Sequence, residues 1–242
     1  MTRKIINLLI MACLAILIFI EGIYLGPHYA PASANVRGYH IAMYKNAAMW
    51  ELNWMGVPTI QNPNDVWIIQ EIISEMKPDF IVETGTSRGG SALLWATILQ
   101  QVNPQGKVVS VDIEDLKPQS MPPIAERIDF LIGSSVDPNV VESIHRRVRG
   151  KSVMVILDSN HHKNHVFQEL QSYWEIVPVG GYIIVQDTNI SGHPVDLAEY
   201  RNDGPMEAVE EFLSSNDRFE SDKSREKLLF TMHPDGYLKR IK

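Results

Sequence analysis

The sequence DFIVETGTSRGGSALL, from Asp79 to Leu94, decides the expected fold of this chain. Its apolar start predicts a strand over Phe80 to Glu83, which a turn containing Gly85, Gly89 and Gly90 joins to a helix-like segment. A strand, a glycine-rich turn and a helix in this order form the first unit of many nucleotide-binding sheets. The residues of the turn then restrict which ligand it can hold.

Two phosphate-binding motifs fit this turn poorly. A Walker-type loop ends in Gly-Lys-Ser/Thr, whereas this turn ends in Gly89-Gly90-Ser91 and has no lysine there. The dinucleotide fingerprint needs a second glycine where this chain has Ser87. This difference argues against a nicotinamide dinucleotide as the ligand, but that alternative stays open. The remaining ligand is a nucleoside without phosphates. S-adenosylmethionine fits, because it is a cation with an ammonium group and a ribose diol.

Acidic residues at the ends of two predicted strands support this nucleoside. Glu83 ends the first strand and is predicted to accept hydrogen bonds from the ammonium side. Asp112 ends the second strand, VVSVD, and is placed for the ribose hydroxyls, while the segment Gly133 to Ser135 after the third strand is predicted to line the adenine. The predicted cofactor-binding residues are Glu83, Gly85, Thr86, Ser87, Gly89, Asp112, Gly133 and Ser134.

Short apolar runs alternate with helix-period segments through most of the chain. Strands are predicted over Phe80 to Glu83, Val108 to Asp112, Phe130 to Ile132, Val153 to Asp158 and Tyr182 to Asp187, and helices over Asn62 to Met76, Ser91 to Gln100, Asn139 to Arg149, His165 to Ile176 and from Pro205. This alternation predicts an α/β, Rossmann-like, doubly wound and mostly parallel sheet, with its ligand site at the carboxyl ends of the strands. The C-terminal segments EKLLFTM and GYLKRI, joined by HPDG, predict an antiparallel hairpin at one edge.

A second group of polar residues follows the fourth and fifth strands. VILDSNHHKNH places Asp158 at the end of the fourth strand, and YIIVQDTN places Gln186 and Asp187 at the end of the fifth. Oxygen ligands of this kind suit Mg²⁺, so these three residues are the predicted metal ligands. His161 and His162 are the predicted catalytic bases, because methyl transfer to a hydroxyl releases a proton. A solvated loop and a helix cap remain the structural alternatives for these residues, and zinc is disfavoured by the histidine spacing.

The composition excludes some classes of partner. The chain has 242 residues and a formal net charge of −7, which argues against general binding to nucleic acid. Cys13 is the only cysteine and lies in the N-terminal apolar run, so the folded domain has no disulfide.

The first residues differ in character from the rest. Ile5 to Leu25 is almost wholly apolar and, as a helix, would be about 31 Å long, which is enough to span a bilayer. A single-pass membrane anchor is therefore predicted, with a cleaved signal peptide ending at ASA, residues 32–34, as the alternative. Arg3 and Lys4 favour a domain outside the cell, whereas the methyl donor is made in the cytoplasm, so sidedness stays open. The expected organisation is a basic tip (1–4), the anchor (5–25), a linker and cap segment (26–60), and a methyltransferase-like domain (61–242).

The segments quoted above, with NWMGVPTIQNPNDVWIIQEIISEM before them and GPMEAVEEFL after them, resemble the cephalosporin hydroxylase / rhamnosyl O-methyltransferase family from about Asn53 to the C-terminus. The resemblance implies an S-adenosylmethionine-dependent methyltransferase fold with Mg²⁺ at a carboxylate cluster. It assigns Glu83, Gly85 and Asp112 to the cofactor and Asp158 and Asp187 to the metal. The family often has an acidic pair where this chain has Gln186-Asp187, and its members act on antibiotics, glycolipid sugars and other hydroxylated compounds.

The sequence thus predicts a membrane-anchored O-methyltransferase acting on a hydroxyl of a small or lipid-linked molecule such as a sugar. The loop Ser191 to Gly204 is predicted to cover the acceptor, with Tyr200 and Arg201 as contacts. Two alternatives stay open at this point. One is an NAD(P)-dependent oxidoreductase, and the other is a membrane-tethered, non-catalytic nucleoside-binding module, suggested by Gln186.

Overall fold

The computed structural model describes residues 34–46 and 50–242 of the chain. The predicted anchor, residues 5–25, lies outside this part. Within the described ranges, no helix is both long enough and apolar enough to cross a membrane.

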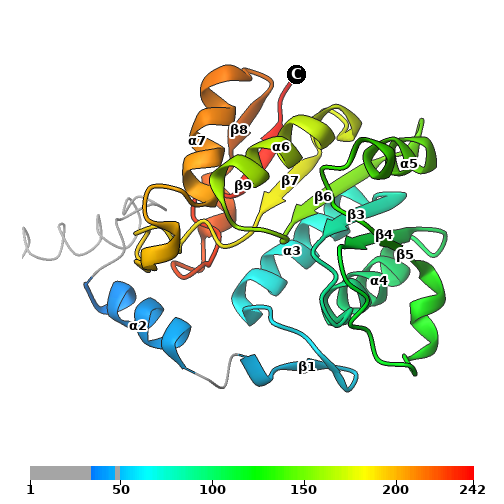
Figure 1. Ribbon diagram of the computed structural model, residues 1–242, viewed down its shortest axis with the longest axis horizontal. Helices are drawn as coiled ribbons and strands as arrows, with labels where there is room; N and C mark the ends of the chain where they lie inside the picture. The colour runs from blue at the N-terminus through cyan, green and yellow to red at the C-terminus, as the bar shows by residue number, and fades with distance from the viewer. Residues whose placement is uncertain (1–33, 47–49) are drawn as a thin grey trace, which may run out of the picture.

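A seven-stranded sheet forms the centre of the fold, with strand order β5-β4-β3-β6-β7-β9-β8 (Figure 1). The strands are β3 (Phe80–Thr84), β4 (Lys107–Asp112), β5 (Ile128–Ile132), β6 (Val153–Leu157), β7 (Tyr182–Val185), β8 (Phe219–Ser221) and β9 (Tyr237–Arg240). The first five run parallel to one another, and β9 pairs antiparallel with both β7 and β8. The prediction of a mostly parallel α/β sheet with antiparallel C-terminal strands is confirmed.

Helices cover both faces of the sheet, and each face has its own apolar core. The helices are α2 (Ala34–Lys45), α3 (Pro63–Met76), α4 (Gly90–Val102), α5 (Pro138–Val148), α6 (Lys163–Tyr173) and α7 (Pro205–Ser215). Side chains of α3 and α4 pack on one face, around the fully buried Trp95, and those of α5, α6 and α7 pack on the other, around Phe212. Strands buried on both faces explain why their sequences are almost continuously apolar.

Local sequence sets the first residues of these helices. Asn62 caps α3 by accepting from the backbone N–H of Asn64, and Pro63 follows at the first helical position. Asp137 caps α5 in the same way. The start of α3 is thereby fixed next to the carboxyl ends of the strands, where its polar residues reach the site described below.

The prediction of the C-terminal hairpin is wrong for its first strand. β9 agrees with the predicted GYLKRI strand, but its antiparallel partners are β7 and β8, and Glu226 to Met232 forms no strand. Leu229 has a positive φ of 63°, which breaks an extended run, and the backbone N–H of Met232 donates to the carboxylate of Asp65. The buried carboxylate of Asp65 on α3 therefore accepts the backbone hydrogen bond that a neighbouring strand would otherwise accept from Met232.

The segment before α3 packs beside the main domain. It contains α2 and a small hairpin of β1 (Asn53–Trp54) and β2 (Val57–Pro58). Trp54 Nε1 donates to Thr97 Oγ1 of α4 at 3.2 Å, and His40 of α2 is buried against the ring of Phe230. The hairpin also brings Pro58 to the glycine turn, where a Cβ on Gly90 would lie 2.1 Å from the Pro58 carbonyl oxygen.

Candidate active site

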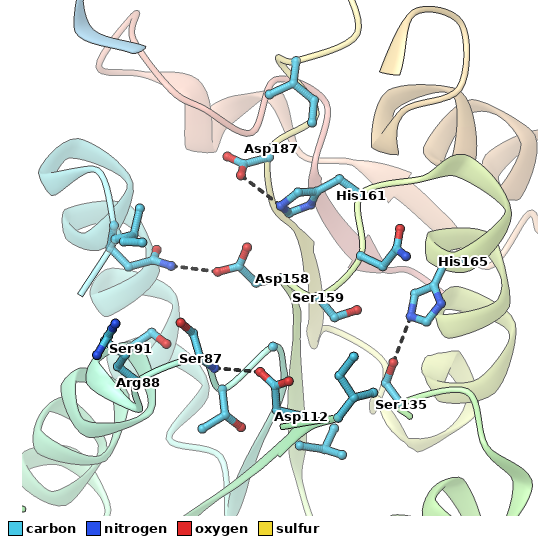
Figure 2. A pocket seen from close by; sticks show the side chains of 18 of the residues that line it. Ser87, Arg88, Ser91, Asp112, Ser135, Asp158, Ser159, His161, His165 and Asp187 are labelled. Atoms are coloured by element: carbon cyan, nitrogen blue, oxygen red, sulfur yellow. Dashed lines mark hydrogen bonds and ion pairs between the residues drawn. The ribbon is translucent and has the colours of Figure 1, made fainter. Parts of the chain in front are cut away.

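One cavity of about 1000 Å³ lies at the carboxyl ends of the central strands (Figure 2). The glycine turn after β3, the ends of β4 and β5, and the loops after β6 and β7 all contribute to its lining. This is the edge of the sheet at which the sequence predicted a ligand. The volume is at the upper end of the range for small-molecule sites, which leaves room for a nucleoside and a second molecule.

The glycine turn passes very close to the strand beside it. Gly85 has a φ of 87°, and a Cβ at this position would lie 1.9 Å from the backbone oxygen of Asp158. Any side chain there would require the two segments to separate. Gly85, Thr86 and Ser87 all line the cavity, whereas Gly89 caps α4 behind it with a φ of 82°.

Asp112 lies opposite this turn. Its Oδ2 accepts from the backbone N–H of Ser87 at 2.7 Å (Figure 2). Its Oδ1 accepts from the N–H of Glu114 at 3.2 Å. Asp112 lines the cavity together with Gly133 and Ser134 from the loop after β5. The acid, the turn and this loop thus surround one region of the cavity, and Asp112 also helps to fix the shape of the turn.

Glu83 is placed differently from its prediction. It is fully buried beneath the turn, where Oε1 accepts from Trp95 Nε1 at 2.9 Å and Oε2 from Ser110 Oγ at 2.6 Å. Burial raises the pKa of Glu83 to about 7, although these hydrogen bonds act to lower it. Because its side chain does not line the cavity, the structure does not support a direct contact between Glu83 and the ammonium group.

Asp158, His161 and Asp187 form a cluster beside the turn, with His161 and Asp187 on the far side of Asp158 from Ser87 and Asp112 (Figure 2). One ligand-type atom from each of the three lies within 4.8 Å of those of the others, and His161 Nε2 is 3.4 Å from Asp187 Oδ2 (Figure 2). Burial holds the pKa of Asp158 well above its ordinary range, and the negative charges of Asp187 and then Glu83 raise it further. A divalent cation between the two carboxylates would offset this repulsion, so the residues fit a hard metal ion such as Mg²⁺.

Gln186, which was predicted as a metal ligand, does not line the cavity. Its side chain is buried behind the cavity, and its Oε1 accepts from Gln61 Nε2 at 2.9 Å. The same Gln61 nitrogen donates to Asp158 Oδ2 at 3.0 Å. Gln61 was missed by the sequence analysis, because a glutamine just before a helix start has no pattern that marks it as part of a site.

The two predicted bases differ in their surroundings. His161 is partly buried and belongs to the cluster, whereas His162 is more exposed and its Nδ1 lies 3.1 Å from Asp203 Oδ2. Both line the cavity. His165, which was not predicted as a site residue, also lines it and pairs with Ser135 Oγ at 3.1 Å (Figure 2).

The loop predicted as a cover contributes one side of the cavity. Leu197, Glu199 and Tyr200 line it, and the Tyr200 ring lies 5.1 Å from that of His162. Arg201 instead pairs with Asp196, with Nη2 2.7 Å from Oδ2. Of the two predicted contact residues, Tyr200 lines the cavity and Arg201 does not.

Comparisons with known proteins show the family of this chain. The family model described as Rhamnosyl O-methyltransferase/CmcI matches residues 46–241. The rhamnosyl O-methyltransferase of Mycobacterium tuberculosis (strain ATCC 25618 / H37Rv) is 36% identical over 221 residues, covering 88% of this chain and 87% of the relative. That of Mycobacterium leprae (strain TN) is 34% identical over 222 residues, covering 89% and 94%.

Solved structures share the fold. The structure described as "cmcI-D160 Mg-SAM" has a TM-score of 0.61 at 20% sequence identity, covering 80% of this chain and 78% of that one. The structure described as "CmcI-N160 apo-structure" has the same TM-score at 19% identity, covering 80% and 77%. At such identities the likeness concerns the fold alone.

Fold, site and relatives together define an S-adenosylmethionine-dependent methyltransferase. The chain belongs to the rhamnosyl O-methyltransferase/CmcI family. This decides between the alternatives left open by the sequence, in favour of the methyltransferase and against the NAD(P)-dependent oxidoreductase and the non-catalytic binding module.

Proposed function

We propose that the enzyme transfers the methyl group of S-adenosylmethionine to a hydroxyl of a small or lipid-linked acceptor, with a sugar as the preferred class. One observation carries this proposal: the glycine turn and the Asp158–His161–Asp187 cluster open into the same cavity. Methyl transfer is an in-line displacement, so donor and acceptor must meet at about 3–3.5 Å between the reacting atoms. A sugar acceptor is favoured because relatives covering most of the chain are named rhamnosyl O-methyltransferases.

The cofactor region is proposed to consist of the turn, Asp112 and the loop after β5. The turn approaches the ligand with its backbone, because Gly85 has no side chain to hold it away. The carboxylate of Asp112 is available to the ribose hydroxyls, and Gly133 and Ser134 border the adenine. Glu83 supports the turn from beneath, since its Oε2 accepts from Ser110 Oγ, which in turn pairs with Thr86 Oγ1 at 2.7 Å.

The acceptor region is proposed to lie at the carboxylate cluster. Asp158 and Asp187 would hold Mg²⁺, with His161 beside them, and when bound the ion would orient the acceptor oxygen and lower its pKa. His161 is the proposed general base. It takes the hydroxyl proton as the oxygen forms a bond to the methyl carbon and the sulfur–methyl bond breaks, which leaves S-adenosylhomocysteine. Tyr200 and Leu197 border the side where the acceptor enters.

The proposed setting is a membrane, reached through residues 5–25 as a single-pass anchor. A reporter fused after Lys242 would show on which side of the membrane the domain lies. Release of the chain into the soluble fraction, with residues 1–34 cleaved, would favour the signal-peptide alternative.

The test is methyl transfer by the full-length protein in detergent, from radiolabelled S-adenosylmethionine to aryl rhamnosides and to rhamnose-containing glycolipids, with Mg²⁺ or with EDTA. We expect transfer that EDTA abolishes, and a loss of at least about 100-fold in Asp158→Asn and Asp187→Asn while calorimetry still detects cofactor binding. Asp217→Asn, at an exposed ion pair with Lys242, is the matched control and should behave as wild type. Transfer that persists in EDTA and in both variants would disprove the role of the metal.

A further inference from the structure

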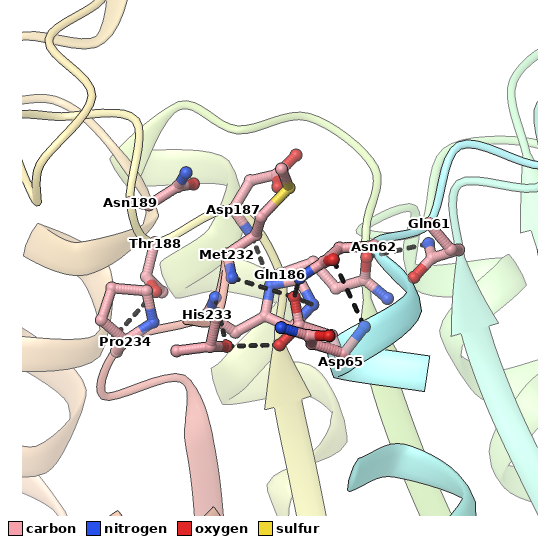
Figure 3. Close-up of polar contacts among 12 residues, drawn as sticks. Gln61, Asn62, Asp65, Gln186, Asp187, Thr188, Asn189, Met232, His233 and Pro234 are labelled. Atoms are coloured by element: carbon pink, nitrogen blue, oxygen red, sulfur yellow. Dashed lines mark hydrogen bonds and ion pairs between the residues drawn. The ribbon is translucent and has the colours of Figure 1, made fainter. Parts of the chain in front are cut away.

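The backbone at Asp187 has an unusual conformation that another residue maintains. Asp187 follows β7 with a φ of 55°, in the left-handed region that non-glycine residues seldom occupy. Its backbone N–H donates to Nδ1 of His233 at 3.0 Å (Figure 3). The direction of the Asp187 carboxylate depends on this backbone conformation, so the hydrogen bond bears on the geometry of the carboxylate cluster.

His233 is a buried residue with a fixed tautomer. Its side chain is 3% exposed. Because Nδ1 accepts a hydrogen bond, the neutral ring carries its proton on Nε2. This Nε2 lies 3.7 Å from Asp65 Oδ2 and has no hydrogen-bond partner among the described residues. The imidazole therefore sits between a backbone donor at the site and a buried carboxylate on α3.

Asp65 fixes the segment that carries His233. It is fully buried in the first turn of α3. Its Oδ2 accepts from Asn62 Nδ2 at 2.7 Å and from the backbone N–H of Met232 at 2.9 Å, and its Oδ1 accepts from Tyr237 Oη at 2.9 Å and from Thr231 Oγ1 (Figure 3). Thr231 Oγ1 also accepts from the backbone N–H of His233 at 3.0 Å. One carboxylate thus holds both sides of His233 in place.

Among the contacts between this segment and the loop after β7 in the described part of the chain, only the one at Asp187 needs a particular side chain on the segment itself. Thr188 Oγ1 donates to the carbonyl of Pro234, and the N–H of Asn189 donates to the carbonyl of Met232 at 3.3 Å. Any residue supplies a carbonyl oxygen, so these two contacts say little about side-chain identity. The contact at Asp187 instead requires an acceptor at the place of Nδ1, and this points to a role for the imidazole beyond packing.

We propose that His233 is a positioning residue, which holds the Asp187 backbone in its left-handed conformation so that the carboxylate faces Asp158 and His161, with Asp65 fixing the ring. The inference rests on the proposed function, because it assigns a task to the place where acceptor and metal would meet. It does not depend on the identity of the acceptor.

Two amide variants of the full-length protein test this role. In His233→Asn the amide oxygen can take the place of Nδ1, whereas in His233→Gln the amide lies one bond further out, near the place of Nε2. Both are polar and similar in chemistry, so a purely structural role predicts similar effects. The measurements are crystal structures of both variants, Mg²⁺ and S-adenosylmethionine affinities by calorimetry, and kcat and KM for methyl transfer.

We expect Asp187 to keep a positive φ in His233→Asn and to lose it in His233→Gln. Mg²⁺ affinity and kcat should fall about 10- to 100-fold in His233→Gln and less than about fivefold in His233→Asn. Cofactor affinity should stay within about twofold in both, because Asp187 belongs to none of the segments that form the proposed cofactor region. If His233→Gln fails to fold, retention of the Asp187 geometry and of kcat by His233→Asn remains the decisive result.

Two outcomes overturn the inference: an unmoved Asp187 with unchanged Mg²⁺ affinity in His233→Gln, or equal losses in both variants. Failure of the proposed function would look different, since wild-type protein would then bind no Mg²⁺ or transfer no methyl group. In that case the crystal structures alone still decide whether His233 positions Asp187.

Discussion

Replacing Glu83 by glutamine should stabilise the protein at alkaline pH, because it removes a buried charge and keeps the hydrogen bonds. The Glu83 oxygens accept from Trp95 Nε1 and Ser110 Oγ. A glutamine oxygen can retain the bond from Trp95, and its NH₂ group can donate to Ser110 Oγ once the Ser110 hydroxyl turns to Thr86, 2.7 Å away. The site therefore accommodates a neutral side chain of the same shape.

The size of the effect follows from the raised pKa of Glu83. A change from the ordinary 4.5 to about 7 corresponds, at 1.36 kcal/mol per pKa unit, to roughly 3 kcal/mol for ionising this group in the folded state. Since the folded-state pKa is the higher one, the folded protein binds the proton more tightly. The unfavourable contribution is absent below pH 4.5, grows as pH rises to about 7, and is constant above that.

The assay is urea unfolding followed by tryptophan fluorescence, for wild type and Glu83→Gln from pH 4.5 to 8.5. The difference in free energy of unfolding should be near zero at the acid end and reach roughly 3 kcal/mol in favour of the variant above pH 7. Glu220→Gln, on the exposed face of β8, is the matched control and should show no such trend. A difference that does not change with pH, or a variant less stable than wild type at pH 8, would refute the reasoning.

The same variant tests the predicted contact between Glu83 and the ammonium group. Because Glu83 does not line the cavity, the affinity for S-adenosylmethionine measured by calorimetry should change less than about fivefold. A loss of 100-fold or more, equal to about 2.7 kcal/mol, would instead indicate a direct ionic contact with the cofactor.

Three further variants test the remaining parts of the site. Gly85→Ala should reduce cofactor affinity at least about 100-fold by calorimetry, because its Cβ would lie 1.9 Å from the Asp158 carbonyl oxygen. Asp112→Asn should weaken cofactor binding about tenfold, with little loss of stability, since an amide oxygen can still accept from Ser87 N–H. Gln61→Leu leaves Asp158 without its buried donor, so kcat/KM should fall about 10- to 100-fold while cofactor affinity is retained. An unchanged result in any of these assays would remove that residue from the proposed role.

Much of the fold was predictable because its signals are local. The apolar runs that became β3, β4, β6 and β7 lie between helix-period segments, and a strand buried on both faces needs no long-range information to be recognised. The hairpin failed for the opposite reason. Glu226 to Met232 has strand-like residues, but Asp65, more than 160 positions earlier, binds the backbone N–H of Met232.

The candidate site divides in the same way. Asp112, Asp158 and Asp187 were predicted, because each follows an apolar run and the ends of parallel strands meet at one edge of the sheet. Glu83 and Gln186 also lie at strand ends, yet their side chains point into the protein, where Trp95 and Gln61 bind them. Successive side chains of a strand point to opposite faces of the sheet. Two neighbouring residues at a strand end can therefore differ, one lining the cavity and the other being buried.

The sequence by itself determined that this chain forms a parallel sheet, that a glycine turn follows its first strand, and that acidic residues collect at one edge. These features depend on the pattern and conformational freedom of neighbouring residues. Only the tertiary structure decided that His161 lies with the two carboxylates, that Gln186 is buried against Gln61, and that Gln61 donates to Asp158 while His233 accepts from the backbone N–H of Asp187. Such contacts join residues far apart in the chain, and they exist only once the sheet and α3 have packed together.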